Sequence, residues 1–339
     1  MTLDGTARPA PVERAGEPQR VAAVVFNPTK VDSDRLRAAV QAGAEAAGWG
    51  ETFYIPTDPD DGGVAAARLA LERGADVVMA VGGDGTVRAV AEGLRGSGVP
   101  IALLPSGTGN LLARNLDFTL GALEDSVAVA FAGADRDIDL GIVELTRADG
   151  GVEEHAFLVM AGLGLDAKMM ANTRPGLKKA VGWLAYVDGG MRALAEIEPI
   201  EISYSVNGAP RRSIDVLTVL VGNCGALTGG ILLMPDAKVD DGVLDVVALR
   251  PRGPFGWLRV WRKIGWENGV LRKSAVGRRI VDLSKDVRDV RYVTGTTFDV
   301  VLESAQEVEL DGDEFGTATS VRCWTEHLGL TVKVPRPAG

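Results

Sequence analysis

In the first part of the chain, short apolar runs alternate with stretches whose hydrophobic residues recur at helical spacing. The apolar runs have no alternating polar positions, which is typical of strands covered by helices on both faces. The expected strands are residues 21–26, 52–56, 76–82 and 99–106, and the expected helices are residues 34–48, 64–74, 86–94 and 110–116. This order predicts a doubly wound parallel α/β sheet, whose ligands bind beyond the carboxyl ends of the strands. The loops after Phe26, Val81 and Pro105 are therefore expected to face one crevice.

After about residue 137 the pattern changes, and expected strands follow one another directly. They are residues 139–145, 155–162, 200–206, 213–222, 242–249, 288–295, 297–303, 306–313 and 330–335. This succession predicts an antiparallel β-sandwich, interrupted by helical insertions near residues 177–195 and 255–279. We therefore divide the chain into a disordered tail (1–19), an α/β domain (20–137) and a β-sandwich domain (138–336).

Two segments could be mistaken for targeting or membrane signals. Residues 1–19 contain three prolines and scattered charges, and they lack the apolar run of a secretory signal. Residues 216–234 carry no charge and are long enough to span a bilayer. Their β-branched start and four glycines instead favour a buried strand that enters a glycine-rich loop.

Composition narrows the class of protein. With 339 residues, 46% of them hydrophobic, the chain can bury the cores of two domains. The net charge of -10 excludes a protein-wide basic footprint for nucleic acid. The two cysteines, Cys224 and Cys323, have no metal-binding spacing, and the chain is too large to need disulfides. These features predict a cytoplasmic protein without a metal cluster.

Two glycine-rich loops follow neighbouring expected strands, and each precedes an expected helix. They are Gly82-Gly83-Asp84-Gly85-Thr86 and Ser106-Gly107-Thr108-Gly109-Asn110. Glycines let the backbone approach a phosphate, and the free amides at a helix start point toward the anion. Asp84 could hold Mg2+ or a hydroxyl, or it could simply cap the helix.

The first expected strand ends in a third polar loop. Asn27 and Thr29 offer polar contacts there, and Lys30 offers a charge for phosphate. Three such loops at one edge of a parallel sheet predict a phosphate-binding crevice.

The order of the motifs along the chain resembles the diacylglycerol kinase catalytic fold, in particular soluble bacterial lipid kinases related to sphingosine kinases. The motifs are Asn27-Pro28-Thr29, Gly82–Thr86, Ser106–Asn110 and residues 161–167, 177–186, 222–246 and 309–313. The resemblance covers nearly the whole chain after residue 20. It implies an N-terminal nucleotide-binding domain like that of NAD kinase and diacylglycerol kinase, with a C-terminal β-sandwich that binds lipid.

The resemblance also implies an activity, which is transfer of the γ-phosphoryl group of ATP to a lipid hydroxyl, with ATP bound between the domains. By similarity the nucleotide contacts are Asn27, Thr29, Thr57, Gly83, Asp84, Gly85, Thr86 and Thr108. Asp311 resembles the general base, because an alcohol needs a positioned carboxylate to accept its proton. Asp313 and Asp84 are the other candidate catalytic acids. Taken without the upstream loops, Asp311-Gly312 reads as a hairpin turn.

Residues 235–243 resemble a structural magnesium loop of this family. The resemblance implies that Asp241 supplies a carboxylate and that Lys238 and Val243 supply carbonyls, which is a donor set that Mg2+ accepts. An ordinary acidic turn between strands is the alternative. Lys178 or Lys179 could reach the phosphates, or could be solvated at a helix end.

The sequence departs from the family pattern after both glycine-rich loops. The family often has Asn-Glu after the first loop and Asp after the second, where this chain has Arg88, Ala89 and Leu111. A carboxylate near the nucleotide is thus missing twice, and Glu92, one turn later, is a candidate substitute.

A local reversal of charge lies at residues 250–279. This segment contains nine basic residues and a single acidic residue, Glu267. Between them in the sequence are Phe255, Trp257, Trp261 and Trp266. This composition suits a segment resting on an anionic membrane, which predicts a cytoplasmic, peripherally membrane-associated protein that meets its lipid substrate there. Packing of the tryptophans onto the sandwich is the alternative.

Two other functions stay open on the sequence alone. One is a NAD kinase-like enzyme, which shares the first glycine-rich loop. The other is a catalytically weak module that binds lipid or nucleotide. The sequence names neither the acceptor lipid nor the oligomeric state, and a homodimer remains one option.

Overall fold

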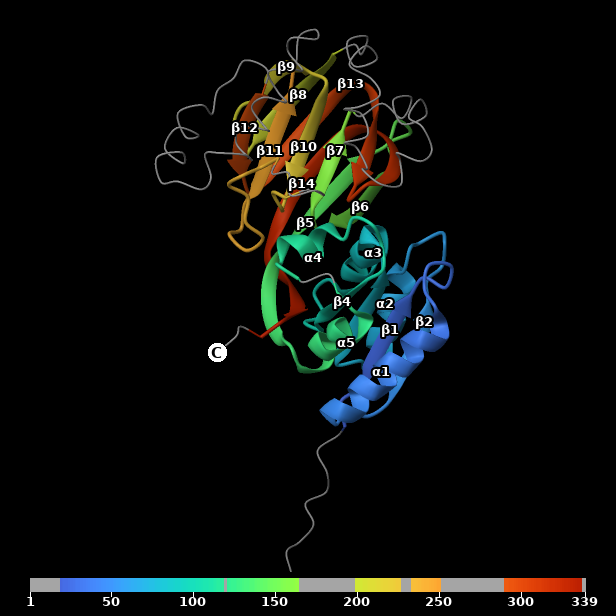
Figure 1. Ribbon diagram of the computed structural model, residues 1–339. Helices are drawn as coiled ribbons and strands as arrows, with labels where there is room; N and C mark the ends of the chain where they lie inside the picture. Colours follow the sequence, from blue (N-terminus) through green and yellow to red (C-terminus); the bar gives the residue numbers. More distant parts are fainter. Residues whose placement is uncertain (1–18, 119–120, 165–198, 227–232, 251–289, 337–339) are drawn as a thin grey trace, which may run out of the picture.

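The computed structural model describes residues 19–118, 121–164, 199–226, 233–250 and 290–336. They form two lobes stacked end to end, with helices confined to one lobe (Figure 1). Several expectations lie outside the described residues. They are nearly all of the tail, both helical insertions, Lys178 and Lys179, and the basic segment after Arg250.

The first lobe is built on a parallel sheet in the order β4-β3-β1-β2. Its strands are β1 (Ala22–Phe26), β2 (Thr52–Pro56), β3 (Val77–Gly82) and β4 (Ile101–Pro105). Its helices are α1 (Ser33–Ala47), α2 (Val64–Glu72), α3 (Asp84–Leu94), α4 (Leu111–Asn115) and α5 (Leu123–Ala132). The predicted doubly wound sheet is confirmed, and only α5 was not expected.

Successive residues of β1 belong to two different hydrophobic cores. Ala23 and Val25 pack in the core that includes residues of α2 and α3. Ala22 and Val24 pack in the core that includes residues of α1 and α5. Full burial of a valine side chain stabilises the fold by about 1.5–3 kcal/mol. A strand with both faces buried in this way has no polar positions, which explains its apolar sequence.

The second lobe is the expected antiparallel β-sandwich. Its strands are β6 (Val152–Phe157), β7 (Met160–Leu163), β8 (Ile200–Val206), β9 (Arg212–Val216), β10 (Thr218–Gly222), β11 (Leu244–Leu249), β12 (Val290–Gly295) and β13 (Thr297–Leu310). The first half of β13 pairs with β8 and its last residues pair with β7, so β13 belongs to both layers. The apolar core between the layers includes Phe157, Phe298 and Leu310.

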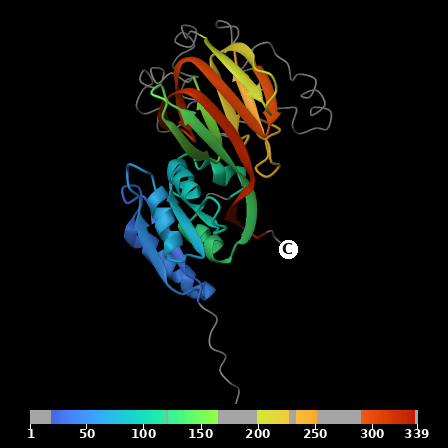
Figure 2. The same ribbon diagram turned by 180° about the vertical axis from the view of Figure 1, so that it is seen from behind.

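Two long strands run between the lobes, β5 (Ala134–Thr146) and β14 (Asp313–Val334) (Figure 2). They pair with each other over most of their length, with an irregularity between Glu326 and Leu330. The far end of β14 joins the parallel sheet, where Val332 is the register partner of Ile101 in β4. The lobes are therefore connected by hydrogen-bonded backbone.

Two expected strands are each divided in the structure. The run at residues 155–162 breaks between β6 and β7 at Leu158 and Val159, and the run at residues 213–222 breaks between β9 and β10 at Leu217. All three residues at the breaks are buried, so hydropathy gives no sign of the interruption. The first break leaves several backbone amides free to bind a side chain.

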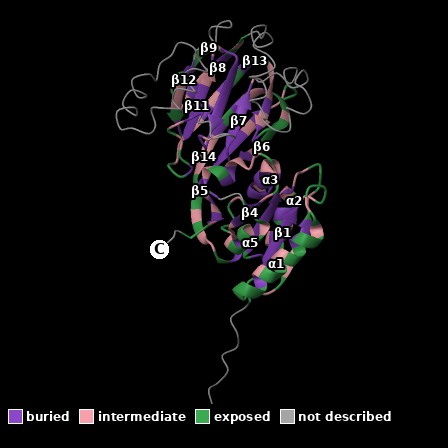
Figure 3. Cartoon of the chain, in the orientation of Figure 1, coloured by how far each residue is buried: buried purple, intermediate pink, exposed green. Residues whose placement is uncertain are grey.

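Burial follows the layers of both lobes (Figure 3). The strands of the parallel sheet and the inner faces of the sandwich are buried, whereas the outer face of α1 is exposed. Among the helices that the structure describes, none is long and apolar enough to cross a bilayer.

Candidate active site

Both glycine-rich loops lie at the carboxyl edge of the parallel sheet. Gly82 at the end of β3 is the register partner of Pro105 at the end of β4. The Ser106 amide donates to the Gly82 carbonyl at 3.0 Å, and the Asn27 amide donates to the Val81 carbonyl at 3.2 Å. The loops after β1, β3 and β4 are thus adjacent along one edge.

The two glycine-rich loops touch backbone to backbone. A Cβ atom added to Gly107 would lie 2.8 Å from the Cα of Gly83, closer than real Cβ atoms come. Asp84 links the loops further, because its Oδ1 accepts a hydrogen bond from the Leu111 amide at 2.6 Å. Burial raises the pKa of Asp84, partly offset by the backbone amides of Leu111 and Asn110. Leu111, one of the departures from the family pattern, thus contributes its amide here.

The remaining predicted nucleotide contacts surround these loops. Asn27 Oδ1 accepts hydrogen bonds from the Thr29 amide at 3.0 Å and the Thr29 hydroxyl at 2.7 Å. The Thr57 amide donates to the Phe26 carbonyl at 2.9 Å. Lys30 and Thr108 are exposed, whereas Thr86 is buried beneath the first loop. The structure therefore gathers all of these residues at one edge of the α/β lobe.

The sandwich lobe contributes a hairpin turn between β13 and β14. Asp311 (φ 50°) and Gly312 (φ 89°) occupy the turn with left-handed backbone, and Leu310 pairs with Asp313 across it. Asp311 and Gly312 therefore do form the hairpin turn that their sequence predicts. It does not decide the role of the side chains.

Asp311 is 7% exposed, and its carboxylate is held by backbone amides. Oδ2 accepts from Leu158 at 2.8 Å, and Oδ1 accepts from Val159 and Met160 at 2.9 Å each. These are the amides released by the break between β6 and β7. Burial raises the pKa of Asp311 to about 6, although the three amides and the charge of Arg88 oppose the shift.

Asp313 is exposed and lies across the lobe boundary. A Cβ atom added to Gly85 would collide with Asp313 Oδ2, so this carboxylate lies against the start of α3. Its charge contributes to the raised pKa of Asp84. Asp313 therefore lies close enough to Asp84 to affect its charge across the lobe boundary, and Asp311 is buried in the same hairpin as Asp313.

The predicted magnesium loop, residues 235–243, is fixed to the lobe-connecting strand β5. The Gly242 amide donates to Asp139 Oδ2 at 2.6 Å, and the Asp139 amide donates to the Val239 carbonyl at 2.7 Å. Asp241 is exposed, and its Oδ1 accepts from the Val243 amide at 3.3 Å. One carboxylate with backbone carbonyls is a donor set that suits Mg2+. Within the described residues no group of three or more His, Cys, Asp or Glu side chains could hold a metal ion.

The sequence analysis did not predict that Arg88, Glu92 and His155 form one cluster beside the candidate site. Arg88 Nη1 donates to Glu92 Oε2 at 3.1 Å, and the same oxygen accepts from the Ala156 amide at 2.9 Å. His155 Nδ1 lies 3.5 Å from Glu92 Oε1. Burial opposes ionisation of Glu92, but these partners together hold its pKa below the usual range. The spacing of four residues between Arg88 and Glu92 could have predicted their ion pair, because residues four apart on a helix are neighbours.

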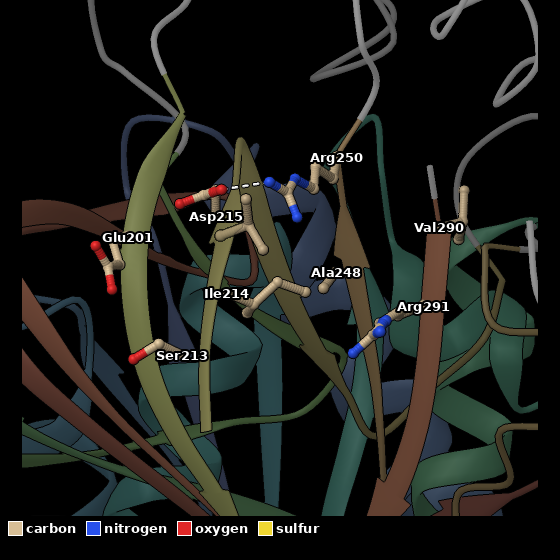
Figure 4. Close-up of a pocket in the computed structure, with 9 residues that line it drawn as sticks. Glu201, Ser213, Ile214, Asp215, Ala248, Arg250, Val290 and Arg291 are labelled. Atoms are coloured by element: carbon tan, nitrogen blue, oxygen red, sulfur yellow. Dashed lines mark hydrogen bonds and ion pairs between the residues drawn. The ribbon is translucent and has the colours of Figure 1, made fainter. Parts of the chain in front are cut away.

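A cavity of about 330 Å³ opens elsewhere, at the edge of the sandwich between β9 and β12 (Figure 4). Its charged lining residues are Glu201, Asp215, Arg250 and Arg291, and Arg250 forms an ion pair with Asp215. None of its described lining residues belongs to the predicted site.

Comparisons with known proteins agree with this two-lobe plan. Residues 21–143 match the diacylglycerol kinase catalytic domain, and residues 158–328 match the YegS C-terminal NAD kinase beta sandwich-like domain. A probable lipid kinase YegS-like of Pseudomonas aeruginosa is 35% identical over 254 residues, which are 73% of this chain and 78% of that protein. A diacylglycerol kinase of Mycobacterium tuberculosis is 29% identical over 196 residues, covering 58% of this chain and 62% of its own.

A solved structure supports the same fold. The crystal structure of a putative diacylglycerol kinase from Bacillus anthracis has a TM-score of 0.71 at 20% identity, and the match covers 96% of this chain and 99% of that one. The shared architecture therefore extends over both lobes.

Proposed function

This chain belongs to the lipid kinase family that carries a diacylglycerol kinase catalytic domain, and from that premise we propose its reaction. The γ-phosphoryl group of ATP passes to the hydroxyl of diacylglycerol or of a related long-chain lipid alcohol. The observation that carries the proposal is the meeting of two features across the lobe boundary. The joined glycine-rich loops of one lobe face the Asp311–Asp313 hairpin of the other.

The loops are suited to hold the phosphates of ATP. Backbone amides of residues 82–86 and 107–110 lie at the start of helices or next to one, where amides favour anions. Lys30 adds a positive charge at the end of β1, and Asn27, Thr29 and Thr57 add polar groups beside it. Phosphoryl transfer depends mainly on such positioning and on charge stabilisation.

Asp311 is the proposed general base. Its Oδ1 accepts two amides and its Oδ2 accepts one, so one acceptor position of Oδ2 is left for a hydroxyl. A pKa of about 6 lies near neutrality, which favours proton transfer in both directions. As the lipid oxygen bonds to the γ-phosphorus, its proton passes to Asp311 and the bond to the β-phosphate oxygen breaks, which releases ADP. Asp84 and Asp313 border the same space and are the other proposed catalytic acids.

Residues 235–243 would hold a structural Mg2+. Asp241 would supply the carboxylate, and Lys238 and Val243 would supply carbonyls, because hard oxygen donors with several waters suit this ion. When bound, the ion would neutralise the acidic loop and hold it in one conformation. The loop's own contact with Asp139 already fixes it next to the lobe boundary.

The lipid substrate is proposed to be met at an anionic membrane surface. The basic segment at residues 250–279 begins at Arg250, directly after β11 of the sandwich. Trp257, Trp261 and Trp266 among arginines suit an interfacial contact, because the rings enter the headgroup region while the charges attract anionic lipids.

The test is transfer of label from γ-labelled ATP to lipids in mixed micelles with Mg2+. The panel contains diacylglycerol, ceramide, sphingosine and polyprenol, with NAD as a parallel acceptor. A labelled lipid is the expected result and identifies the substrate class. Label on NAD alone, or ATP binding without transfer to any acceptor, would contradict the proposal.

A further inference from the structure

Helix α3 presents two arginines to the sandwich lobe, and their surroundings differ. Arg95, at the end of the helix, donates to Glu326 of β14 and pairs with Glu154 of β6. Its side chain is 30% exposed. The side chain of Arg88, near the start of the helix, is only 8% exposed. A charge this deeply buried needs a specific partner.

Arg88 contacts the strand that follows the catalytic hairpin. The centre of its guanidinium lies 4.5 Å from the centre of the Phe315 ring on β14. The Phe315 ring also packs against His155, with ring centres 4.7 Å apart. Phe315 is only four residues beyond Asp311. Arg88 therefore packs against the arm of the hairpin that carries Asp313.

The segment at residues 156–160 connects the partners of Arg88. Its first amide, from Ala156, binds Glu92, which is the ion-pair partner of Arg88. Its last three amides bind Asp311, whose charge Arg88 stabilises from α3. Arg88 is thus the cation that pairs with half-buried Glu92 and acts on the charge of buried Asp311, and both carboxylates bind amides of one backbone segment.

The other titratable groups around Asp311 do not supply a positive charge. Burial and the charge of Asp311 both raise the pKa of the Cys224 thiol, which keeps it neutral. The exposed Asp313 and the half-buried Asp84 are carboxylates. Arg88 also has an unused donor, because its buried Nε has no hydrogen-bond partner among the residues described. The ion pair with Glu92 alone does not account for the position of the Arg88 guanidinium, which also packs on Phe315.

We propose that Arg88 is a positioning residue for phosphoryl transfer, whose guanidinium is the counter-charge that docks the Asp311–Asp313 hairpin onto helix α3. In this role it orients Asp311 toward the acceptor and keeps Asp313 against Gly85, without touching either substrate. The inference rests on the proposed function, because it assumes that this hairpin carries the reacting carboxylates. It also gives a role to a residue that departs from the family pattern.

The experiment compares Arg88→Gln with Arg88→Lys and with the matched control Arg95→Gln. Arg88 lies in α3 and Arg95 caps the end of this helix, and both contact the sandwich lobe, but the partners of Arg95 are Glu154 and Glu326, outside the hairpin turn. Amide hydrogen exchange of the peptide at residues 156–163 reports whether the three amides remain bound to Asp311. Kinetic assays give kcat and KM for ATP and for the lipid, and calorimetry gives Kd for a non-hydrolysable ATP analogue.

For Arg88→Gln we expect exchange in this peptide to accelerate by about tenfold and kcat to fall by about 100-fold, since small misplacements of reacting groups have effects of that size. The Kd of the ATP analogue should stay within about threefold, because Arg88 does not face the nucleotide loops. Arg88→Lys, which keeps the charge, should restore most of the protection and of kcat. Arg95→Gln should leave both unchanged while lowering the melting temperature.

Equal effects of Arg88→Gln and Arg95→Gln on exchange and kcat would overturn the proposal, because both would then simply hold the lobes together. A loss of nucleotide affinity that parallels the loss of kcat would also overturn it, since Arg88 would then bind ATP. If Arg88→Gln does not fold, Arg88→Lys is compared with Arg95→Lys instead. Faster amide exchange at residues 156–163 in Arg88→Lys would then contradict the role of Arg88 as a counter-charge. A wild-type protein that labels no lipid overturns the proposed function, whereas the exchange measurement still tests Arg88.

Discussion

The carboxylate of Asp313, on the sandwich lobe, lies directly against the backbone of Gly85 at the start of helix α3. Gly85 does not have the left-handed backbone that usually demands glycine. A Cβ atom at this position would instead collide with the Asp313 carboxylate of the other lobe, which would have to move. The first glycine-rich loop therefore leaves room for Asp313, in addition to its proposed role in binding phosphate.

Replacing Gly85 with alanine should displace Asp313. Because the exposed Asp313 carboxylate can rotate away from the new methyl group, Gly85→Ala alone should destabilise the protein by no more than about 1 kcal/mol, at the low end of the effect of overpacking a core. In an Asp313→Ala background the same change should be neutral or stabilising by up to about 1 kcal/mol, because alanine is the better helix former. Denaturant unfolding of the four proteins gives the coupling energy. Additive effects would show that the two residues do not touch.

The buried carboxyl of Asp311 should control the acid side of the pH dependence. With a pKa of about 6, it is ionised and able to accept a proton only above that pH. We expect kcat/KM to fall as pH decreases through about 6, and Asp311→Asn to abolish turnover. A pH profile that is flat between pH about 5 and 7 in the wild-type protein would exclude Asp311 as the base.

Asp311 should also make the free energy of unfolding depend on pH. Its pKa is raised from 3.8, so the native state binds a proton that the unfolded state has lost between pH about 4 and 6. The free energy of unfolding should therefore decrease with rising pH in this window, by up to about 1.4 kcal/mol per pH unit from this group. Asp311→Asn should lose that part of the slope. Equal slopes in both proteins, measured by urea unfolding, would contradict the raised pKa.

The parts of the fold that could be predicted from sequence follow from burial. Strands such as β1 are apolar throughout because helices cover both faces, and strand ends of a parallel sheet share one edge whatever the loops contain. The adjacent positions of the two loops that contain Gly83 and Gly107 could therefore be predicted from the sequence. Both loops are local in sequence, and both lie where topology requires.

The sandwich side could not be placed in this way. Most of β14 was not predicted, because residues such as Arg322 and Glu326 alternate with buried ones irregularly and the strand bulges before Leu330. The amides that hold Asp311 come from residues about 150 positions earlier, and they exist only because β6 and β7 are interrupted. The docking role of Arg88 depends on the same long-range contacts.

Membrane binding through the basic segment can be tested by charge reversal. Changing Arg259, Arg262 and Lys263 to Glu should strongly reduce sedimentation with anionic liposomes, since each basic residue near such a surface contributes about 1 kcal/mol. Activity on detergent-dispersed lipid should stay within about twofold. Reversal of the exposed Arg35, Arg68 and Arg73 changes the net charge equally and is the control. Equal loss of sedimentation in both triple variants would mean that only net charge matters.

Magnesium binding at residues 235–243 can be separated from any Mg2+ that accompanies ATP by working without nucleotide. Added Mg2+ should raise the melting temperature of the wild-type protein, because an ion that binds only the native state stabilises it. Asp241→Ala should remove this increase. The neighbouring Asp240 pairs with Arg136 at 2.7 Å, so Asp240→Ala should keep it. An increase that survives in Asp241→Ala would contradict this assignment of the ligands.

The contact between the glycine-rich loops predicts a defect in nucleotide binding. In Gly107→Ala the new methyl group would meet the Cα of Gly83, so the loops must separate by a few tenths of an ångström or more. Their amides would then no longer converge on the same phosphates, and the Kd for an ATP analogue should rise by about tenfold or more, equivalent to at least about 1.4 kcal/mol. Calorimetric titration measures this change directly.

Gly208→Ala is the matched control for that experiment. Gly208 has positive φ, a Cβ atom added to it would have open space around it, and it lies in the turn between β8 and β9 of the other lobe. It should lower stability through backbone strain while leaving the Kd of the ATP analogue unchanged. If Gly107→Ala affects only stability, as Gly208→Ala should, then the close approach of the two loops serves the fold and does not shape the phosphate site.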